Sequence, residues 1–462
     1  MKPTLSQLLL IPVFLLWSWH LQAQNLQTRR IDSLMQAANS TGVFNGNVLV
    51  AQHGKAIYHK AIGYADATKS KMLNPDLYFD IGSISKEFNG IGIMILQEQG
   101  KLRLSDPVAK YLPYLPEWAK HVKLLDLVNY TSGLPVSNAM ADSDYYNILN
   151  NLKTLAFEPG KSYIYSNDNV YLQKRIIEKV SGLSFNDFVV KYIFKPCKML
   201  NSGMDLKFND PKMAQAFDSN YRPTPYTQES SGWVRLTMDD LYRYTTCLNS
   251  YQLIKHDSYQ ELAAGFGDGE SSLGSAQFEN NQLIWHQHHG SNYNYEALMT
   301  SDLKEDITVI LMTNSQQFKV SPLTTAIMNI IKGKPYTVPQ KSLYLDLREK
   351  VLANFDMGIA FYRSVHENPQ SNYDLSFEIG DLVNTGKYLM RRNKFDEAIQ
   401  IFNLGTLLKI KNTDYSLVYQ LIGESYAKKG NKDTAILYYI QAVAQDADNK
   451  VAKGFLAELH KN

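Results

Sequence analysis

Residues 80–100, DIGSISKEFNGIGIMILQEQG, place a serine and a lysine where an apolar helix begins. The apolar side chains recur at helical spacing, which predicts a buried helix that ends at Gly100. Ser83 and Lys86 are three residues apart, so their side chains share a face of the first turn, where unpaired backbone N–H groups also lie. This arrangement suits a nucleophilic serine beside a lysine.

A purely structural interpretation of Ser83 is also available, because serine is a common N-cap residue. The same S-x-x-K pattern occurs at Ser301 with Lys304 and at Ser425 with Lys428, where no related motif lies nearby. The pattern alone therefore does not identify a nucleophile, and partner motifs elsewhere in the chain must decide.

The composition of the 462-residue chain restricts its partners. Hydrophobic residues make up 44% of it, which provides core material for two or more structural units. The formal net charge is +2, from 47 Lys and Arg against 45 Asp and Glu. No large basic excess therefore points to nucleic acid or to an anionic membrane surface. We expect a small-molecule or peptide substrate instead.

The first 23 residues have the pattern of a secretory signal peptide. Lys2 precedes an apolar run from Leu8 to Trp19, and Ala23 is a small residue suited to cleavage. The run is shorter than the ~20 residues that span a bilayer, and no cysteine follows it to carry lipid. We expect residues 1–23 to be removed, leaving a periplasmic or secreted protein without a membrane span.

The two cysteines, Cys197 and Cys247, are too few for a disulfide scaffold. An exported protein can pair them, but the sequence does not give the distance between them. Their pairing stays open at this point.

Strand patterns lie at both ends of the first two thirds of the chain. Residues 46–64 alternate on both sides of His53 and Gly54, which predicts a hairpin. Three later strands and a helix are predicted over residues 282–290, 294–302, 307–314 and 321–331. The segment between is mostly helical and rich in loops. We expect the hairpin to join the late strands in one antiparallel sheet, giving a layered α/β domain with an inserted helical lobe.

A change of composition follows Gly333, where two prolines punctuate the chain. The predicted domain covers residues 24–333, and a linker with a connecting helix covers 334–377. Residues 378–462 are predicted to form a small all-α repeat domain.

A spacing of small and large residues recurs after 37 positions in this last part, at Gly386, Ala398 and Phe402 and again at Gly423, Ala435 and Tyr439. It resembles the tetratricopeptide repeat, in which small residues let two antiparallel helices pack closely. Residues 451–460 would form a capping helix. The repeats are expected either to dock a protein partner or to brace the rest of the chain.

A tyrosine is a candidate partner of Ser83. Tyr165 and Asn167 form a Y-x-N pattern between a Pro-Gly turn and a helical run, whereas a second Y-x-N, at residues 145–147, lacks this context. Alone, Tyr165 is a packed aromatic residue. Beside an ammonium group its phenolate would be stabilised, which makes it a candidate general base.

Three histidines in four positions, within residues 285–292 (WHQHHGSN), invite a metal-site interpretation. No aspartate follows in the H-x-H-x-D-H manner, and no other His, Cys or Asp cluster nearby completes a ligand set. Gly290 favours a strand edge along which a substrate backbone lies closely. No metal and no cofactor are expected.

The motifs in this order resemble those of serine β-lactamase-like hydrolases: S-x-x-K at Ser83 and Lys86, Y-x-N at Tyr165 and Asn167, and K/H-T/S-G at His288, His289 and Gly290. Residues 128–135 (VNYTSGLP), 230–244 and 334–339 also resemble features of this family. The resemblance covers about Gly46 to Pro339. Tyrosine in the second motif is similar to class C β-lactamases, D,D-peptidases and related esterases.

The resemblance implies a role for each residue. Ser83 would attack a carbonyl and become acylated, and Lys86 would accept its proton. Tyr165 would pass a proton to the leaving group and activate water for deacylation. Asn167 would orient Lys86 and the substrate amide. The backbone N–H groups of Ser83 and Ser291 would form the oxyanion hole.

Two departures from the family pattern concern specificity. His288 and His289 stand where the best-known members have lysine and a hydroxyl residue that hold a substrate carboxylate, and Tyr130 stands where relatives often have histidine. We therefore expect an esterase or D-peptidase rather than a true β-lactamase. The alternative is a binding protein on a hydrolase scaffold that has lost its activity.

Overall fold

The computed structural model describes residues 26–225, 231–267 and 269–459. The predicted signal peptide, residues 1–23, lies outside these ranges. The chain divides into two units between Val338 and Pro339, five residues beyond the predicted domain end. None of the described helices is both long and apolar enough to span a bilayer.

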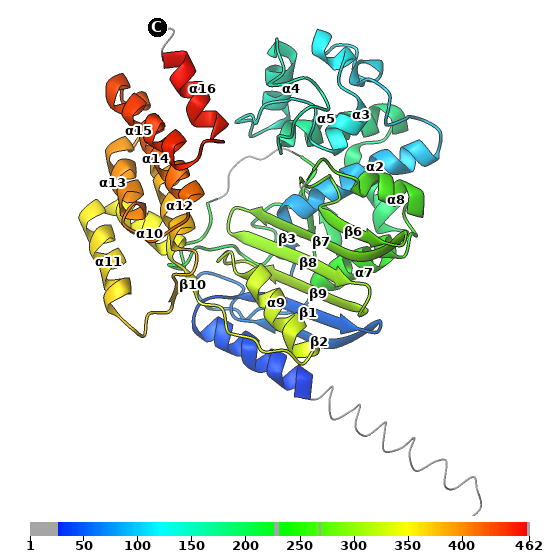
Figure 1. Cartoon of the computed structure of the whole chain (residues 1–462). Coiled ribbons are helices and arrows are strands. Elements are labelled where there is room, and N and C mark those ends of the chain that lie inside the picture. Colours follow the sequence, from blue (N-terminus) through cyan, green and yellow to red (C-terminus); the bar gives the residue numbers. More distant parts are fainter. Residues whose placement is uncertain (1–25, 226–230, 268, 460–462) are drawn as a thin grey trace, which may run out of the picture. The chain divides into compact units, whose positions relative to one another are not determined.

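The first unit contains a six-stranded antiparallel sheet in the order β2-β1-β9-β8-β7-β6 (Figure 1). Its strands are β1 (Gly46–Gln52), β2 (Lys55–Ile62), β6 (Ser275–Glu279), β7 (Gln282–Asn292), β8 (Tyr295–Asp302) and β9 (Ile307–Thr313). Because β1 pairs with both β2 and β9, the predicted joining of the N-terminal hairpin to the late strands is confirmed. The short edge strand β6 was not predicted.

Both faces of the sheet are buried, so its central strands are apolar almost throughout. Along β9, Val309 and Leu311 face one core, while Ile310 and Met312 face the other. A helix over residues 26–40 and α9 (Val320–Ile331) cover the first face (Figure 1). Helices α2 (Ser85–Glu98), α7 (Met238–Asn249) and α8 (His256–Ala263) contribute to the second core. The result is the predicted layered α/β domain.

The predicted helical lobe is present beside this second core. It contains α3 (Leu124–Val128), α4 (Asp142–Asn151), α5 (Asn167–Ser181) and α6 (Phe185–Val189). A small sheet, in the order β3-β5-β4, lies nearby and is formed by β3 (Phe79–Asp80), β4 (Ser202–Met204) and β5 (Val234–Leu236). Helix α2 contacts both α5 and α8, and its residues from Ser85 to Leu96 are all buried.

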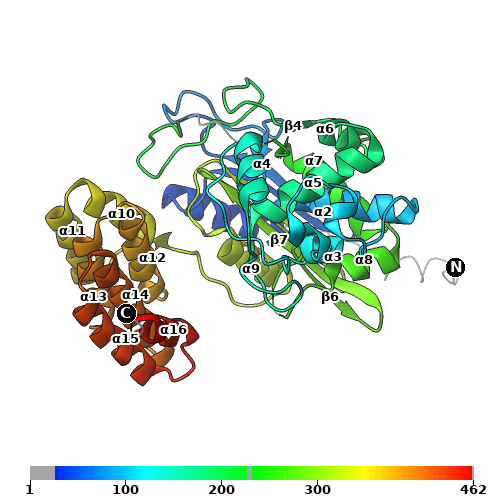
Figure 2. The same ribbon diagram turned by 90° about the horizontal axis from the view of Figure 1, so that it is seen from above.

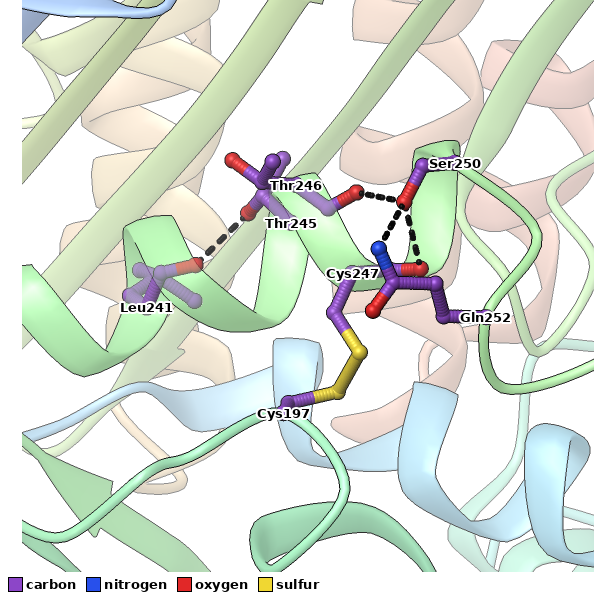
Figure 3. Close-up of a disulfide and its surroundings, with 7 residues drawn as sticks. All are labelled: Cys197, Leu241, Thr245, Thr246, Cys247, Ser250 and Gln252. Carbon is purple, nitrogen blue, oxygen red and sulfur yellow. Dashed lines mark hydrogen bonds between the residues drawn. A yellow bond between two sulfur atoms is a disulfide. The ribbon is translucent and has the colours of Figure 1, made fainter.

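Cys197 and Cys247 form a disulfide, which settles the pairing that the sequence left open (Figure 3). Their Cα atoms are 5.6 Å apart, and the bond closes a sequence separation of 50 residues. It ties the chain just beyond a π-helical turn, Val190–Phe194, to α7. Closing a loop of this length stabilises a fold by about 2–4 kcal/mol.

The second unit is formed mainly by helices (Figure 2), with one short parallel pair of strands, β10 (Lys341–Ser342) and β11 (Tyr373–Asp374). The helices are α10 (Leu343–Ala353), α11 (Phe355–Glu367), α12 (Glu378–Met390), α13 (Phe395–Gly405), α14 (Asn412–Lys428), α15 (Lys432–Gln445) and α16 (Lys450–Leu459). Residues 334–377, predicted as a linker with one connecting helix, contain the two helices α10 and α11. Leu347 and Val351 of α10 share one core with α12–α14, so this stretch belongs to the helical unit.

The predicted contacts between small and large residues occur in the helix pairs α12–α13 and α14–α15. A Cβ on Gly386 would lie 2.2 Å from the Phe402 ring, and one on Gly423 would lie 2.9 Å from the Tyr439 ring. Glycine therefore permits the close packing of each pair. The assignment of these pairs to the tetratricopeptide type stays a prediction.

Candidate active site

Two hydrogen bonds converge on the Ser83 hydroxyl. Lys86 Nζ donates to Ser83 Oγ at 2.9 Å, and the Tyr165 hydroxyl donates to the same oxygen at 2.8 Å. Ser83 lies in the 3₁₀ turn Gly82–Ile84, directly before α2, and the residue at the N-cap of α2 is Ile84. Ser83 is thus not the N-cap of this helix, and the structure brings together the three residues predicted to act in catalysis.

The Lys86 side chain is buried among aromatic rings. Its Nζ lies 5.1 Å from the centre of the Tyr165 ring and 5.6 Å from the centre of the Trp233 ring. Burial lowers the pKa of Lys86 to about 8, although the negative charges of Glu270 and Asp80 oppose this shift. A substantial fraction of the amine is therefore neutral near physiological pH and able to accept a proton.

Tyr165 has the opposite tendency. Burial raises its pKa to about 12, the hydrogen bond to Ser83 opposes the rise, and Glu270 adds to it. The phenol therefore stays protonated at neutral pH. This favours Lys86 over Tyr165 as the base that receives the Ser83 proton, with Tyr165 as a proton donor.

The ring of Tyr130 packs against the ring of Tyr165. The two rings are 4.9 Å apart, and the Ile164 N–H donates to the Tyr130 carbonyl at 3.0 Å. Tyr130 is fully buried and has a φ of 56°, a conformation that is rare for a bulky residue. The loop over residues 128–135 therefore helps to fix the position of the proton donor.

The backbones of β7 and of the turn that carries Ser83 lie in close contact. A Cβ on Gly290 would lie 1.9 Å from the Ile81 carbonyl oxygen and 2.8 Å from the Ser83 nitrogen. A Cβ on Gly82 would lie 2.3 Å from the Ser291 nitrogen. Only glycine fits at both positions, and the two N–H groups predicted to form the oxyanion hole lie on these adjoining backbones.

A buried ion pair anchors the same turn. Asp80 Oδ2 accepts from Arg235 Nε at 2.9 Å and from Asn292 Nδ2 at 3.1 Å, and its Oδ1 accepts from the Gly82 N–H at 2.8 Å. Asp80 and Arg235 are both almost fully buried. One carboxylate thus links β3, β5 and the end of β7 around Ser83.

A cavity of about 390 Å³ opens at Ser83. It is lined by Ser83, Lys86, Ala139, Met140, Tyr145, Tyr165, Asn167, Trp233, Ser291, Asn292 and Tyr293. Asn167, the first residue of α5, and Lys86 both line this cavity, and the role of Asn167 in orienting Lys86 stays a prediction. Tyr145 and Trp233 were not predicted as site residues. In the sequence, Trp233 was marked only by its place next to Gly232 in the 230–244 segment. Tyr145 begins a Y-x-N pattern, but no turn or helical run around it indicated a site.

The histidines of β7 do not lie where a residue that binds the substrate would be expected. His288 is buried, and its Nδ1 lies 2.7 Å from Glu87 Oε1. His289 points to the other face of the strand, where its Nε2 lies 2.9 Å from Glu296 Oε1. Neither lines the cavity, so the prediction that they contact a substrate is not supported. Among the described residues, no group of three or more His, Cys, Asp or Glu side chains is arranged to hold a metal ion.

The family comparison agrees with this geometry. The family model described as Beta-lactamase matches residues 28–329, well over half of the chain. The chain belongs to the β-lactamase family. Its motifs at Ser83, Lys86 and Tyr165 all lie within the matched region.

Relatives of several kinds share this architecture. The chain is 26% identical over 363 residues to Penicillin-binding protein 4* of Bacillus subtilis (strain 168), covering 68% of this chain and 78% of that protein. A class C β-lactamase structure matches with a TM-score of 0.56 and 20% identity, over 67% of this chain and 97% of that one. EstCE1, described as a hydrolase with promiscuous acyltransferase activity, also gives a TM-score of 0.56 at 20% identity, over 67% and 99%. The fold of this β-lactamase-family chain therefore occurs both in a class C β-lactamase and in a hydrolase with promiscuous acyltransferase activity.

The close backbone contact at Gly290 leads to a prediction. Gly290→Ala should lower kcat/KM by about a hundredfold or more, because the new methyl group must push β7 away from the Ser83 turn and the loss of one oxyanion donor commonly costs that much. The measurement is ester hydrolysis by the purified variant.

The matched control is Gly454→Ala in α16, where nothing lies within 4 Å of the added Cβ. It should leave activity unchanged. Wild-type activity in Gly290→Ala would contradict the assignment of the oxyanion hole.

Proposed function

We propose that this protein is an exported serine hydrolase that forms an acyl-enzyme at Ser83 on small ester or amide substrates without a free carboxylate, which among D-amino-acid peptides means those with a blocked C-terminus. The observation that carries the proposal is the convergence of Lys86 Nζ and the Tyr165 hydroxyl on Ser83 Oγ. A nucleophile with a base and an acid in hydrogen-bond contact has the parts that acyl transfer requires.

In the proposed acylation, Ser83 Oγ attacks the substrate carbonyl carbon and its proton moves to the neutral Lys86 amine. The Ser83 and Ser291 N–H groups hold the carbonyl oxygen as it becomes negative. The bond to the leaving group then breaks, and the leaving alcohol or amine takes a proton from Tyr165. Lys86 returns a proton to Tyr165, which restores the pair.

Deacylation repeats these steps with water as the nucleophile. Lys86, directly or through Tyr165, takes a proton from the attacking water, and the Ser83 oxygen regains a proton as the ester bond breaks. Both half-reactions use the same two N–H groups. The mechanism needs no metal and no cofactor.

The charges around the cavity support an uncharged substrate. Among its lining residues, Lys86 is the one that can carry a positive charge, and its neutral form is needed for catalysis. The exposed carboxylate of Glu270 is not a lining residue, but its negative charge acts on both Lys86 and Tyr165 and would therefore also act on a substrate carboxylate held beside them. Neither His288 nor His289 lines the cavity, so the preference for uncharged substrates does not rest on these two side chains.

The proposed export is supported by the Cys197–Cys247 disulfide, since such bonds persist in oxidising compartments. The second unit is proposed either to dock a protein partner or to brace the first unit, and the two proposals are equally supported. A binding protein without activity is the second candidate function. The intact contacts among Ser83, Lys86 and Tyr165 favour the enzyme.

The nucleophile is tested by covalent labelling. A fluorophosphonate probe should label the purified protein, and Ser83→Ala should abolish the labelling, because the probe reacts with an activated serine. Ser85→Ala, which removes a neighbouring hydroxyl, should still be labelled. Labelling that persists in Ser83→Ala would contradict the assignment, and no labelling of the wild type would favour the binding protein.

The base is tested by pH dependence. Because the lowered pKa of Lys86 is about 8 and the neutral form is the active one, kcat/KM for a neutral ester should rise with pH and level off above about pH 8. Lys86→Arg keeps the charge but does not lose its proton in this range, so the residual kcat/KM of this variant should not show the rise with pH. The same rise with pH in Lys86→Arg would assign the titration to another group.

Substrate charge gives a third test. Short-chain aryl esters should be hydrolysed, whereas penicillins and cephalosporins, which carry a carboxylate, should be weak substrates. Glu270→Gln removes the opposing charge and should reduce the difference in kcat/KM between the two classes. Efficient cephalosporin turnover by the wild type would show that this account of the cavity is wrong.

A further inference from the structure

Glu87, the residue after Lys86 on α2, is a buried carboxylate that is held by residues from two other elements. Its Oε1 lies 2.7 Å from His288 Nδ1 and 3.4 Å from His286 Nε2, and its Oε2 accepts from the Tyr244 hydroxyl at 2.5 Å. All four side chains are almost completely buried. A buried carboxylate is costly unless it is well paired, so this cluster strongly fixes the relative positions of its members.

The two histidines have different surroundings. His286 Nδ1 lies 2.9 Å from Asn249 Oδ1, and its Nε2 lies 3.2 Å from the Leu273 carbonyl as well as near Glu87. His286 therefore divides its contacts among several groups. His288 makes the shorter contact with Glu87 and is the closer of the two histidines to Gly290 along β7. Residues 288–291 of β7, which carry the predicted oxyanion N–H of Ser291, are called the oxyanion strand below.

The place of His288 in the sheet makes this contact consequential. The pairing of β6 with β7 ends at Gln287, so the following residues of β7 have no neighbouring strand on that side in the described sheet. The Ser83 turn lies against them instead, through Gly290. His288 is the first residue of β7 beyond the pairing with β6, and it lies three residues before Ser291. On its other side it still pairs with β8.

We propose that Glu87 and His288 form a positioning pair that holds the oxyanion strand against the helix that carries Ser83 and Lys86. The inference rests on the proposed hydrolase function and deepens it. Neither side chain lines the cavity, so the pair acts through the backbone of residues 288–291 and not on the substrate. Its loss should slow the chemical step without weakening substrate binding.

A cluster that only stabilised the core would behave differently. In that case, loss of any contact of Glu87 would lower the stability of the fold, and no single contact would have a separate effect on kcat. Tyr244 provides the comparison, because it bonds to the same carboxylate from α7 and has no direct link to β7. Variants at His288 and Tyr244 therefore separate a positioning role from a structural one.

The experiment uses the full-length protein with a neutral aryl ester and an aryl boronic acid, whose tetrahedral adduct places an oxygen in the oxyanion hole. His288→Leu should lower kcat by about 10- to 100-fold with KM within about twofold, and should raise the inhibition constant of the boronic acid by a similar factor. Tyr244→Phe should lower the melting temperature but leave kcat within about twofold. Labelling of Ser83 by the fluorophosphonate probe is recorded for each variant.

Two further variants cover the case in which His288→Leu does not fold. Asparagine at position 288 can place an N–H close to that of Nδ1, whereas glutamine places it farther out, so His288→Asn should recover most of kcat and His288→Gln should not. Equal kcat in these two variants, or a folded His288→Leu with wild-type kcat, would overturn the positioning role. Parallel losses of stability and kcat in the His288 and Tyr244 variants would also overturn it. Absence of Ser83 labelling in the wild type would instead overturn the proposed function on which it rests.

Discussion

The burial of the Lys86 amine is the constraint on which the site depends. A charged amine is unfavourable in this environment, and the lowered pKa is the direct consequence. The environment is created by a helix that is buried on all sides from Ser85 to Leu96 and by the rings of Tyr165 and Trp233. The same packing that stabilises the domain thus produces an amine that can take a proton from Ser83.

A second constraint is the contact between two backbones. Gly82 and Gly290 let the Ser83 turn and β7 approach more closely than any side chain would permit. Buried carboxylates stand on both sides of this contact: Asp80 binds Arg235 and the Gly82 N–H, and Glu87 binds His288. The Ser83 turn and the adjoining backbone of β7 are thereby held by carboxylates that do not line the cavity, and such fixed positions limit the reorganisation that a reaction there would need.

Much of this arrangement could be predicted from sequence. The strands of the main sheet, the helix after Ser83, and the grouping of Ser83, Lys86 and Tyr165 have local signals in periodicity or in short motifs. The environment of His288 has none, because its partner Glu87 is 201 residues away in sequence and looks like a solvated helical residue. The Asp80–Arg235 pair, 155 residues apart, was missed for the same reason. Residues 334–377 were predicted as a linker with a connecting helix, because no local signal shows that α10 and α11 share a core with α12–α14.

The central claim is that Ser83 carries the acyl group. The most direct measurement is rapid acid quench of the protein with a neutral aryl ester, followed by mass analysis of its peptides. The account predicts one acyl group on the peptide that contains Ser83, at higher occupancy in Tyr165→Phe if deacylation is slowed more than acylation, and none in Ser83→Ala. An acyl group on another residue, or ester turnover that persists in Ser83→Ala, would contradict it.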